Sequence, residues 1–227
     1  MTVRKKSQWT FVFCCMCVFL GRGAAAQAAP TGAATSSPAF ARAQHLRRGI
    51  NLSEWFAQVY DKRGYTREHF ETWTTVEDIA LIKSMGFDHV RLSVNPQPMF
   101  TMNQPQNLPP EYLGYLDTAV KMILDHGLVV VIDMHPESDF KQRLTKDDTF
   151  VEQFADFWRA VAQHYSPWDP DRVIFEILNE PEFTDRYRWL GVQAKLAASI
   201  REGASRHTII SAGARWSNDD ELLFQEP

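Results

Sequence analysis

The chain has 227 residues, of which 44% are hydrophobic and 23% are charged, and this balance excludes a disordered polypeptide. The formal charge of -4, from 24 Lys and Arg against 28 Asp and Glu, argues against a nucleic-acid-binding protein, which usually carries a basic face or stripe. The length allows one large domain or two small ones.

The N-terminal segment, residues 1–28, has the pattern of a secretory signal peptide. Basic residues at 4–6 precede an apolar run from Trp9 to Leu20, and Ala26-Gln27-Ala28 is a cleavage signal of small residues. The run is too short for an ordinary membrane span, although an uncleaved anchor is the alternative. Export with cleavage after Ala28 predicts a secreted or periplasmic protein that has no membrane contact. It also removes all three cysteines, so no disulfide and no thiolate nucleophile is expected.

Residues 29–45 are predicted to be a flexible leader, because Ala, Ser and Pro are frequent among them. From residue 46 to residue 227, helices, breakers, short apolar strands and polar clusters alternate, which predicts one further domain. Helices are predicted over residues 74–85, 111–126, 151–165 and 186–202. After a first strand that ends near Asn51, strands are predicted over residues 87–94, 128–134, 173–178 and 207–212.

Two kinds of local signal indicate where the helices begin and end. Thr74 and Glu77 form the pattern of a capping box at the start of the first helix. Glycine commonly follows the last residue of a helix. Such glycines follow the helical stretches at Gly86, Gly127 and Gly203.

Strands that alternate with helices of ten or more residues predict an α/β fold with a parallel sheet. Two architectures fit, an open doubly wound sheet and a (β/α)8 barrel. The first usually carries a glycine-rich phosphate turn after its first strand, and residues 48–53 contain none. The (β/α)8 TIM barrel is favoured because polar or aromatic residues follow successive strands, as they do at the active-site face of such barrels. These residues are Asn51, Arg91, Asn95, His135, Asn179, Glu180 and Trp216.

The segment from Ile174 to Pro181 contains the strongest local signal. Glu180 stands at a strand end between Asn179 and a proline, a setting that suits a fixed general acid. Glu176 shares its strand parity, so both side chains are expected to face the barrel interior. Because an unpaired buried carboxylate is costly, Glu176 needs a partner, and alternate strands place Arg91 in the same layer. We interpret Glu176 as one half of a buried ion pair.

Four motifs in this order resemble glycoside hydrolase family 5, the cellulase-like family of retaining β-glycosidases on (β/α)8 barrels. They are Gly49-Ile50-Asn51-Leu52, Val90-Arg91-Leu92, Asp133-Met134-His135 and Asn179-Glu180-Pro181. The resemblance implies a glycosidase that hydrolyses O-glycosyl bonds of a β-linked glucan or a related polysaccharide. It implies the general acid/base for Glu180 and a contact with the sugar 2-hydroxyl for Asn179. It also implies an active-site histidine at His135 and, for Arg91, an arginine that orients the nucleophile.

Tryptophan side chains offer flat apolar faces with a polar edge, which suit sugar rings. Trp216, after the fifth strand, and Trp55, after the first, are predicted sugar platforms, with packing at the barrel mouth as the alternative for Trp55. Trp73 and Trp158 are interpreted instead as core residues of helix faces.

The sequence departs from the family pattern after the fifth strand. The resemblance places the nucleophile at the end of a seventh strand, and Glu221 and Glu226 lack that context. We therefore expect a barrel truncated to about its first five βα units, which is poorly folded and inactive by itself. If such a chain were active, the nucleophile would be sought among Glu182, Glu221 and Glu226.

Two other functions stay open. A chain without a nucleophile could be a non-catalytic carbohydrate-binding remnant. Asp133, His135 and Glu180 could instead hold a metal in a hydrolase on the same fold, although no H-x-H or H-E-x-x-H spacing accompanies them. We predict no metal and no other cofactor. The predicted partner is a polysaccharide or oligosaccharide substrate, with no nucleic acid.

Overall fold

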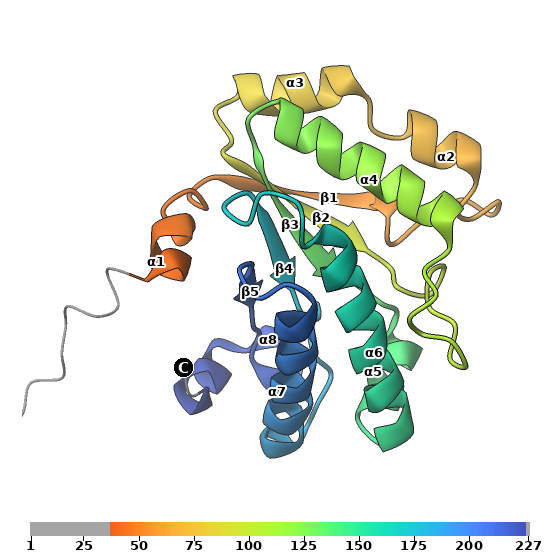
Figure 1. Cartoon of the computed structure of the whole chain (residues 1–227), viewed down its shortest axis with the longest axis vertical. Helices are drawn as coiled ribbons and strands as arrows, with labels where there is room; N and C mark the ends of the chain where they lie inside the picture. The colour runs from red at the N-terminus through yellow and green to blue at the C-terminus, as the bar shows by residue number, and fades with distance from the viewer. Residues whose placement is uncertain (1–36, 226–227) are drawn as a thin grey trace, which may run out of the picture.

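The computed structural model describes residues 37–225 and contains a five-stranded parallel sheet (Figure 1). The strands follow the order β1-β2-β3-β4-β5, so neighbours in the chain are also neighbours in the sheet. Their bounds are Gly49–Phe56 for β1, His89–Val94 for β2, Val129–Met134 for β3, Val173–Glu176 for β4 and Thr208–Ile210 for β5. This order, with helical connections, confirms the predicted alternation of parallel strands and helices. The first strand was predicted to end near Asn51, but β1 begins at Gly49 and continues to Phe56.

Four long helices cover one face of the sheet and match the predicted helices within three residues at each end. They are α3 (Val76–Ser84), α4 (Pro110–Asp125), α6 (Asp148–Tyr165) and α7 (Arg186–Gly203). In Figure 1, α3 and α4 lie side by side over the first strands, and α6 and α7 lie side by side beside the last ones. Shorter helices in the connections were not predicted. They are α1 (Pro38–Ala43), α2 (Arg67–Thr72), α5 (Ser138–Leu144), α8 (Ala214–Ser217) and the 3-10 helix η2 (Asp219–Phe224).

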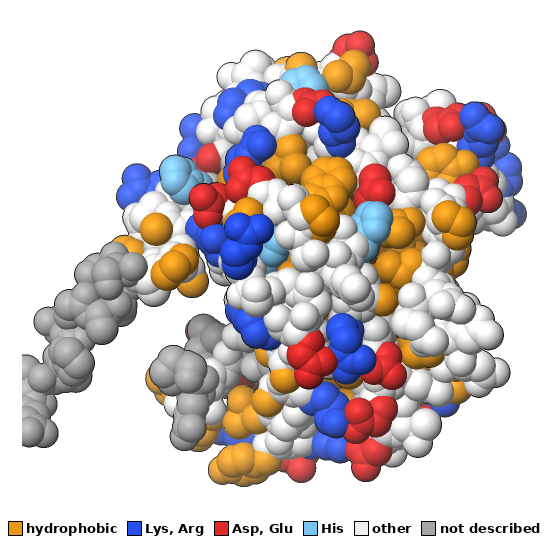
Figure 2. Space-filling view, in the orientation of Figure 1, with side chains coloured by type: hydrophobic (Ala, Val, Ile, Leu, Met, Phe, Trp, Pro, Cys, Tyr) orange, Lys and Arg blue, Asp and Glu red, His pale blue; other side chains and the backbone are white. Residues whose placement is uncertain are grey.

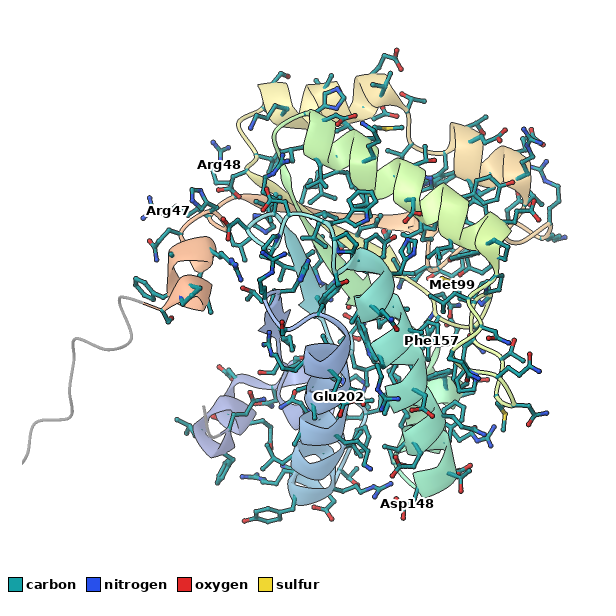
Figure 3. All side chains as sticks on the ribbon, in the orientation of Figure 1. Arg47, Arg48, Met99, Asp148, Phe157 and Glu202 are labelled. Atoms are coloured by element: carbon teal, nitrogen blue, oxygen red, sulfur yellow. The ribbon has the colours of Figure 1, made fainter. Side chains whose placement is uncertain are left out.

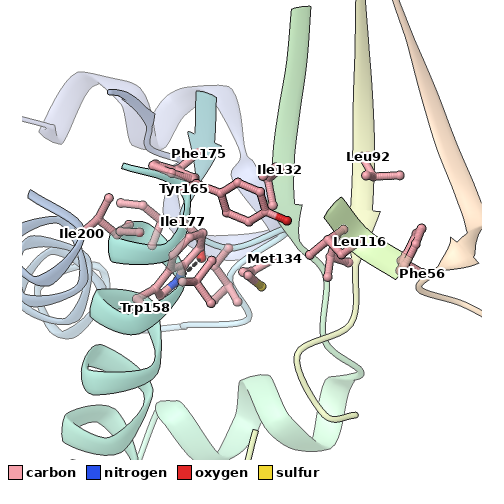
Figure 4. Packing of buried hydrophobic residues seen from close by; sticks show 14 of the residues in the cluster. Phe56, Leu92, Leu116, Ile132, Met134, Trp158, Tyr165, Phe175, Ile177 and Ile200 are labelled. Carbon is pink, nitrogen blue, oxygen red and sulfur yellow. Dashed lines mark hydrogen bonds between the residues drawn. The ribbon is translucent and has the colours of Figure 1, made fainter. Parts of the chain in front are cut away.

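The core lies between the sheet and the long helices. A strand places successive side chains on opposite faces, so alternate strand residues point toward the helices. Leu92, Ile132 and Phe175 are fully buried examples on three different strands (Figure 4). Trp158 on α6 packs among them and donates its indole N–H to the backbone oxygen of Ile177 at 3.1 Å. The prediction that Trp158 is a core residue is confirmed.

The opposite face of the sheet corresponds to the inside of a barrel and is less apolar. Val129, Val131 and Ile174 form a small cluster there, with Leu46 packed against it. Because side chains alternate along each strand, the same register that buries the core collects polar groups on this face toward the carboxyl ends of the strands. These groups are Asn51, Arg91, Ser93, Asp133 and Glu176.

The capping box of α3 lies one residue later than predicted. Thr75 is the N-cap: its hydroxyl accepts the Asp78 backbone N–H, and Asp78 Oδ2 accepts the Thr75 backbone N–H at 2.8 Å. The prediction was one residue too early because Thr74 and Glu77 have the same three-residue spacing as Thr75 and Asp78. Thr74, however, is buried. Gly86 follows the helix as predicted, with a φ of 82° that glycine adopts without strain.

Gly203 has a different role from the predicted helix stop. It is the last residue of α7, and a Cβ added there would lie 2.5 Å from the Arg159 backbone oxygen of α6. The glycine therefore permits close contact between the two helices. Close to the same position, Arg159 Nε donates to Glu202 at 2.6 Å, and Figure 3 labels Glu202 on α7.

Two further expectations were wrong. Trp73, at the end of α2, is 49% exposed and is not a core residue. Residues 38–43 of the predicted leader form α1, and Arg42 from this helix donates to Asp171 at 2.8 Å and to the Arg206 backbone oxygen at 2.6 Å. These contacts hold α1 against the segments that precede β4 and β5. The predicted signal peptide lies outside the described residues.

The surface carries a mixed pattern of charge. Figure 2 shows Lys and Arg side chains interspersed with Asp and Glu on the face that it presents. Within residues 37–225, no helix combines the length and the apolar character needed to cross a membrane.

Candidate active site

Arg91 is the centre of a polar cluster at the carboxyl edge of the sheet. It comes from β2, and its Nε and one terminal nitrogen each lie 2.7 Å from one oxygen of Glu176 on β4. The other terminal nitrogen donates to Asn51 Oδ1 at 2.9 Å. The predicted ion pair between Arg91 and Glu176 is therefore confirmed, and its two-pronged geometry is the strong form of such a contact.

Two carboxylates share this guanidinium. Asp133 Oδ2 lies 3.0 Å from Arg91, and Asp133 and Glu176 are register partners on β3 and β4, so their side chains leave the sheet side by side. Burial raises the pKa of Glu176; the contact with Arg91 opposes this shift, and the charge of Asp133 adds to it. Burial by itself would lower the pKa of Arg91, but the neighbouring carboxylates, Glu180 among them, hold it above its usual value. Arg91 thus stays cationic inside an acidic cluster.

His135 and Asn179 join this cluster, as predicted. His135 follows β3, and its Nδ1 lies 2.9 Å from Asp133 Oδ2. Its Nε2 lies 3.1 Å from Asn179 Nδ2. Asn179 Oδ1 in turn accepts an N–H from Arg91 at 2.9 Å. The four residues form a closed ring of polar contacts, drawn from β2, β3 and the segment after β4.

Glu180 directly follows this ring in the chain. Its side chain is exposed, and its backbone has a φ of 44°. β4 ends at residue 176, so strand alternation does not extend to Glu180, although the charge of Glu180 helps to raise the pKa of Arg91, the partner of Glu176. The two acids accordingly differ in environment. Glu176 is held by Arg91, whereas Glu180 is open to solvent and to a bound molecule.

Backbone strain is concentrated at the same edge of the sheet. Among residues 37–225, every non-glycine residue with positive φ lies at or after the carboxyl end of β1, β4 or β5. They are Glu54, Gln58, Glu180, Arg215, Trp216 and Ser217. Such conformations cost roughly 1–3 kcal/mol each and cluster at active sites and ligand-binding segments. The strain therefore marks the same edge as the polar ring.

The sequence as a whole matches one family of known proteins. A family model described as Cellulase (glycosyl hydrolase family 5) matches residues 52–227. The chain belongs to glycoside hydrolase family 5. This confirms the resemblance carried by the four motifs in and after the strands.

Similar proteins agree with this family 5 assignment. Endoglucanase C of Acetivibrio thermocellus is 31% identical over 183 residues, which cover 78% of this chain and 52% of that protein. Cellodextrinase A of Ruminococcus flavefaciens is 28% identical over 146 residues, which cover 61% of this chain and 41% of that protein. The crystal structure of endoglucanase Cel5A from Thermotoga maritima has a TM-score of 0.71 at 25% identity, covering 83% of this chain and 58% of that one. The (β/α)8 barrel class is confirmed, and the chain spans about half the length of the curated relatives it matches.

The two predicted sugar platforms of this family 5 chain have opposite environments. Trp216 is 56% exposed, and its backbone N–H donates to the Pro181 oxygen at 2.9 Å, which places it beside the Glu180 segment. Trp55 is only 2% exposed and donates its indole N–H to the Phe70 oxygen at 2.9 Å, so it is not a platform in this structure. The reason is an irregularity in β1 between Leu52 and Phe56, which turns Trp55 into the helix layer.

Other polar residues at this edge behave differently from one another. Asn95 directly follows β2 and donates to the hydroxyl group of Tyr65. It organises the loop there and makes no contact with the ring of polar side chains around Arg91. Ser93 was not singled out by sequence, yet its hydroxyl donates to Asn51 Oδ1 at 3.1 Å. The parity that Ser93 shares with Arg91 on β2 is the signal that could have found it.

The proposed metal alternative has no matching geometry. Within the part of the chain that the structure describes, no three His, Cys, Asp or Glu side chains are grouped so that they could hold a metal ion. Asp133 and His135 contact each other and are both engaged in the ring, and Glu180 does not complete a ligand set with them.

Proposed function

We propose that this chain is part of a secreted, retaining glycoside hydrolase that acts on a β-linked glucan or a related polysaccharide. The observation that carries the proposal is an exposed carboxyl group, Glu180, next to a partly buried ring that contains Arg91, His135 and Asn179. Relatives named endoglucanase and cellodextrinase support a β-glucan as the substrate class.

In this proposal Glu180 is the general acid/base. Retaining hydrolysis uses two carboxyl groups about 5–5.5 Å apart, one as nucleophile and one as acid/base. Glu180 gives its proton to the leaving-group oxygen and later takes a proton from the attacking water. Asn179, one residue before it, offers an amide N–H to a sugar hydroxyl, and Trp216 offers an exposed ring face to the sugar. Arg91 orients the nucleophile.

We assign the nucleophile to a position outside the described residues. Of the substitutes considered, Glu182 is bound to Lys141 at 3.0 Å and Glu221 to Arg186 at 3.1 Å, so neither carboxylate is free. Glu226 lies beyond the described residues.

The test of the acid/base assignment is Glu180→Gln in the protein extended to the length of its relatives. Turnover of unactivated β-glucan should fall by about 100- to 10,000-fold, because protonation of the leaving group is lost. Azide should partly restore activity to Glu180→Ala on an activated aryl glycoside. Glu152→Gln, on the surface of α6, is the control and should leave turnover unchanged. Near-normal hydrolysis by Glu180→Gln would end the assignment.

The 227-residue chain by itself should bind β-glucan weakly and not hydrolyse it, because the double displacement needs a nucleophile. Reducing-sugar release from a β-glucan measures this. Hydrolysis by the 227-residue chain would instead place the nucleophile within it, and Glu182, Glu221 and Glu226 would each have to be substituted.

Export is proposed from the N-terminal pattern alone. N-terminal sequencing of the protein recovered outside the cytoplasm should begin near residue 29. A product that still begins at Met1 would favour an uncleaved anchor.

A further inference from the structure

Asp133 is a buried carboxylate whose two oxygens are used unequally. Its side chain is 0% exposed. Oδ2 lies 3.0 Å from a terminal nitrogen of Arg91 and 2.9 Å from His135 Nδ1. Oδ1 has no hydrogen-bond partner among residues 37–225. A half-satisfied buried carboxylate is costly, so packing alone does not explain an aspartate here.

The contact with Arg91 determines which way the Asn179 amide faces. A guanidinium only donates hydrogen bonds, so the Asn179 atom that lies 2.9 Å from it must be the amide oxygen. The amide NH2 group then faces His135 and lies 3.1 Å from Nε2. An NH2 group also only donates, so Nε2 of His135 must carry a lone pair.

His135 therefore has its proton on Nδ1, and Asp133 is the acceptor that keeps it there. With the proton on Nε2, two N–H groups would face each other across the contact with Asn179. Reversing the amide does not remove this conflict, because it would turn the NH2 group toward Arg91. The ring is consistent in only one direction of donation.

We propose that Asp133 is a positioning residue that fixes the tautomer of His135, so that Nε2 accepts one amide N–H of Asn179 and, together with the contact from Arg91, holds the direction in which Asn179 offers its second amide N–H. That second N–H has no acceptor among the residues that the structure describes, and Asn179 directly precedes Glu180. The ligand for it is a sugar hydroxyl. The identity of this ligand rests on the proposed function, whereas the tautomer is a property of the ring itself.

The first arm of the test is two-bond nitrogen–proton NMR of the histidines in the 227-residue chain. His135 should carry its proton on Nδ1, and Asp133→Asn should keep it there, because asparagine retains an acceptor oxygen. Asp133→Ala should move the proton to Nε2 in much of the population. Asp117→Ala is the matched control: it removes an Asp–His contact of 2.8 Å with His164, away from the ring, and should leave His135 unchanged.

Either of two results from this arm would overturn the proposal. One is an Nε2–H tautomer in the unsubstituted chain, a measurement that does not depend on any variant folding. The other is an unchanged Nδ1–H tautomer in Asp133→Ala.

The second arm is cellotetraose binding measured by calorimetry on the same four proteins. Asp133→Ala should bind about tenfold more weakly, the effect of roughly one lost hydrogen bond, and Asp133→Asn should recover most of the affinity. Asp117→Ala should bind like the unsubstituted chain. A tautomer change in Asp133→Ala with undiminished binding would contradict the positioning role. If the unsubstituted chain binds no β-glycan, the proposed function fails, and the NMR arm still decides whether Asp133 sets the tautomer.

Discussion

Arg91 lies between two buried carboxylates, Asp133 and Glu176, and no other Lys or Arg in residues 37–225 contacts either of them. Removing one partner of a buried ion pair leaves an uncompensated charge, which is more damaging than losing the pair altogether. Here a single substitution would leave two such charges in register on neighbouring strands. The guanidinium is therefore as important for the fold of this edge as for the proposed chemistry.

Arg91→Met should lower the free energy of unfolding by about 3–5 kcal/mol. Urea unfolding followed by circular dichroism measures this. Arg159→Met is the control, because it removes exposed ion pairs and should cost less than about 1 kcal/mol. A loss for Arg91→Met no larger than that of the control would show that the cluster is more hydrated than its burial indicates.

Trp216→Ala should weaken cello-oligosaccharide binding by a few-fold to about tenfold, in line with the energy of an aromatic contact. Stability should change by less than about 1 kcal/mol, because the side chain is 56% exposed and its strained backbone is retained. Trp73→Ala removes a similarly exposed indole from α2 and is the control for binding. Unchanged affinity in Trp216→Ala would show that Trp216 does not bind the sugar.

At the scale of elements, α6 and α7 form the closest helix pair of the structure. α6 buries one continuous face, and the missing side chain of Gly203 allows the end of α7 to approach the backbone of α6.

Gly203→Ala should destabilise the chain by about 1–3 kcal/mol, because the new Cβ would lie 2.5 Å from the Arg159 oxygen and 2.8 Å from the Gln163 nitrogen. These are backbone atoms, so one helix must move. Gly191→Ala, in the same helix with no atom within 4 Å, is the matched control and should raise stability by about 0.5–1 kcal/mol. The midpoint of urea unfolding measures both effects. Equal midpoints for the two variants would mean that α6 and α7 move apart without loss of stability.

At the scale of the whole molecule, α1 and a buried histidine lie beside the amino-terminal end of β5. His207 precedes β5, is 1% exposed and stacks on Phe175 with ring centres 5.2 Å apart. Neither ring nitrogen has a hydrogen-bond partner within the described residues. Burial lowers the pKa of His207, and the charges of Arg42, Arg206 and Arg201 lower it further.

The folded chain therefore holds His207 neutral, while the unfolded chain titrates it near pH 6.5. The unfolded state binds the proton more tightly than the folded state. The contribution of neutral His207 to the free energy of unfolding is therefore complete above about pH 6.5, and it is lost as the pH falls toward and through the pKa of the folded state. The slope of the free energy of unfolding should be at most about 1.4 kcal/mol per pH unit below pH 6.5.

His207→Phe keeps the stacking and should remove this slope, as measured by urea unfolding at several pH values. His45→Gln alters an exposed histidine and should retain it. Acids that accept backbone N–H groups, such as Asp147 at the N-cap of α6 and Asp169, have lowered pKa values and lose their contribution only at lower pH. If the slope persists in His207→Phe, the pH dependence of the free energy of unfolding comes from other titratable groups.

Local sequence was sufficient for what depends on periodicity and on spacing along the chain. The apolar repeats placed the long helices and the strands β2 to β4 within three residues, because amphipathic patterns follow directly from helix and strand geometry. Strand parity and layer order also paired Arg91 with Glu176, since both follow from regular alternation. The four motifs in and after the strands were enough to recognise the family.

Only the tertiary structure decided what depends on irregular backbone and on contacts between distant segments. It buried Trp55 and exposed Trp216, because an irregularity in β1 and strained residues after β5 interrupt the alternation on which parity arguments rest. It also closed the ring through Asp133, since that ring needs side chains from β2, from β3 and its following residue, and from the segment after β4 to meet at hydrogen-bond distance. A sequence determines which side chains are available at a strand end, but their burial and the direction of each donated proton are set by neighbours that are far away in the chain.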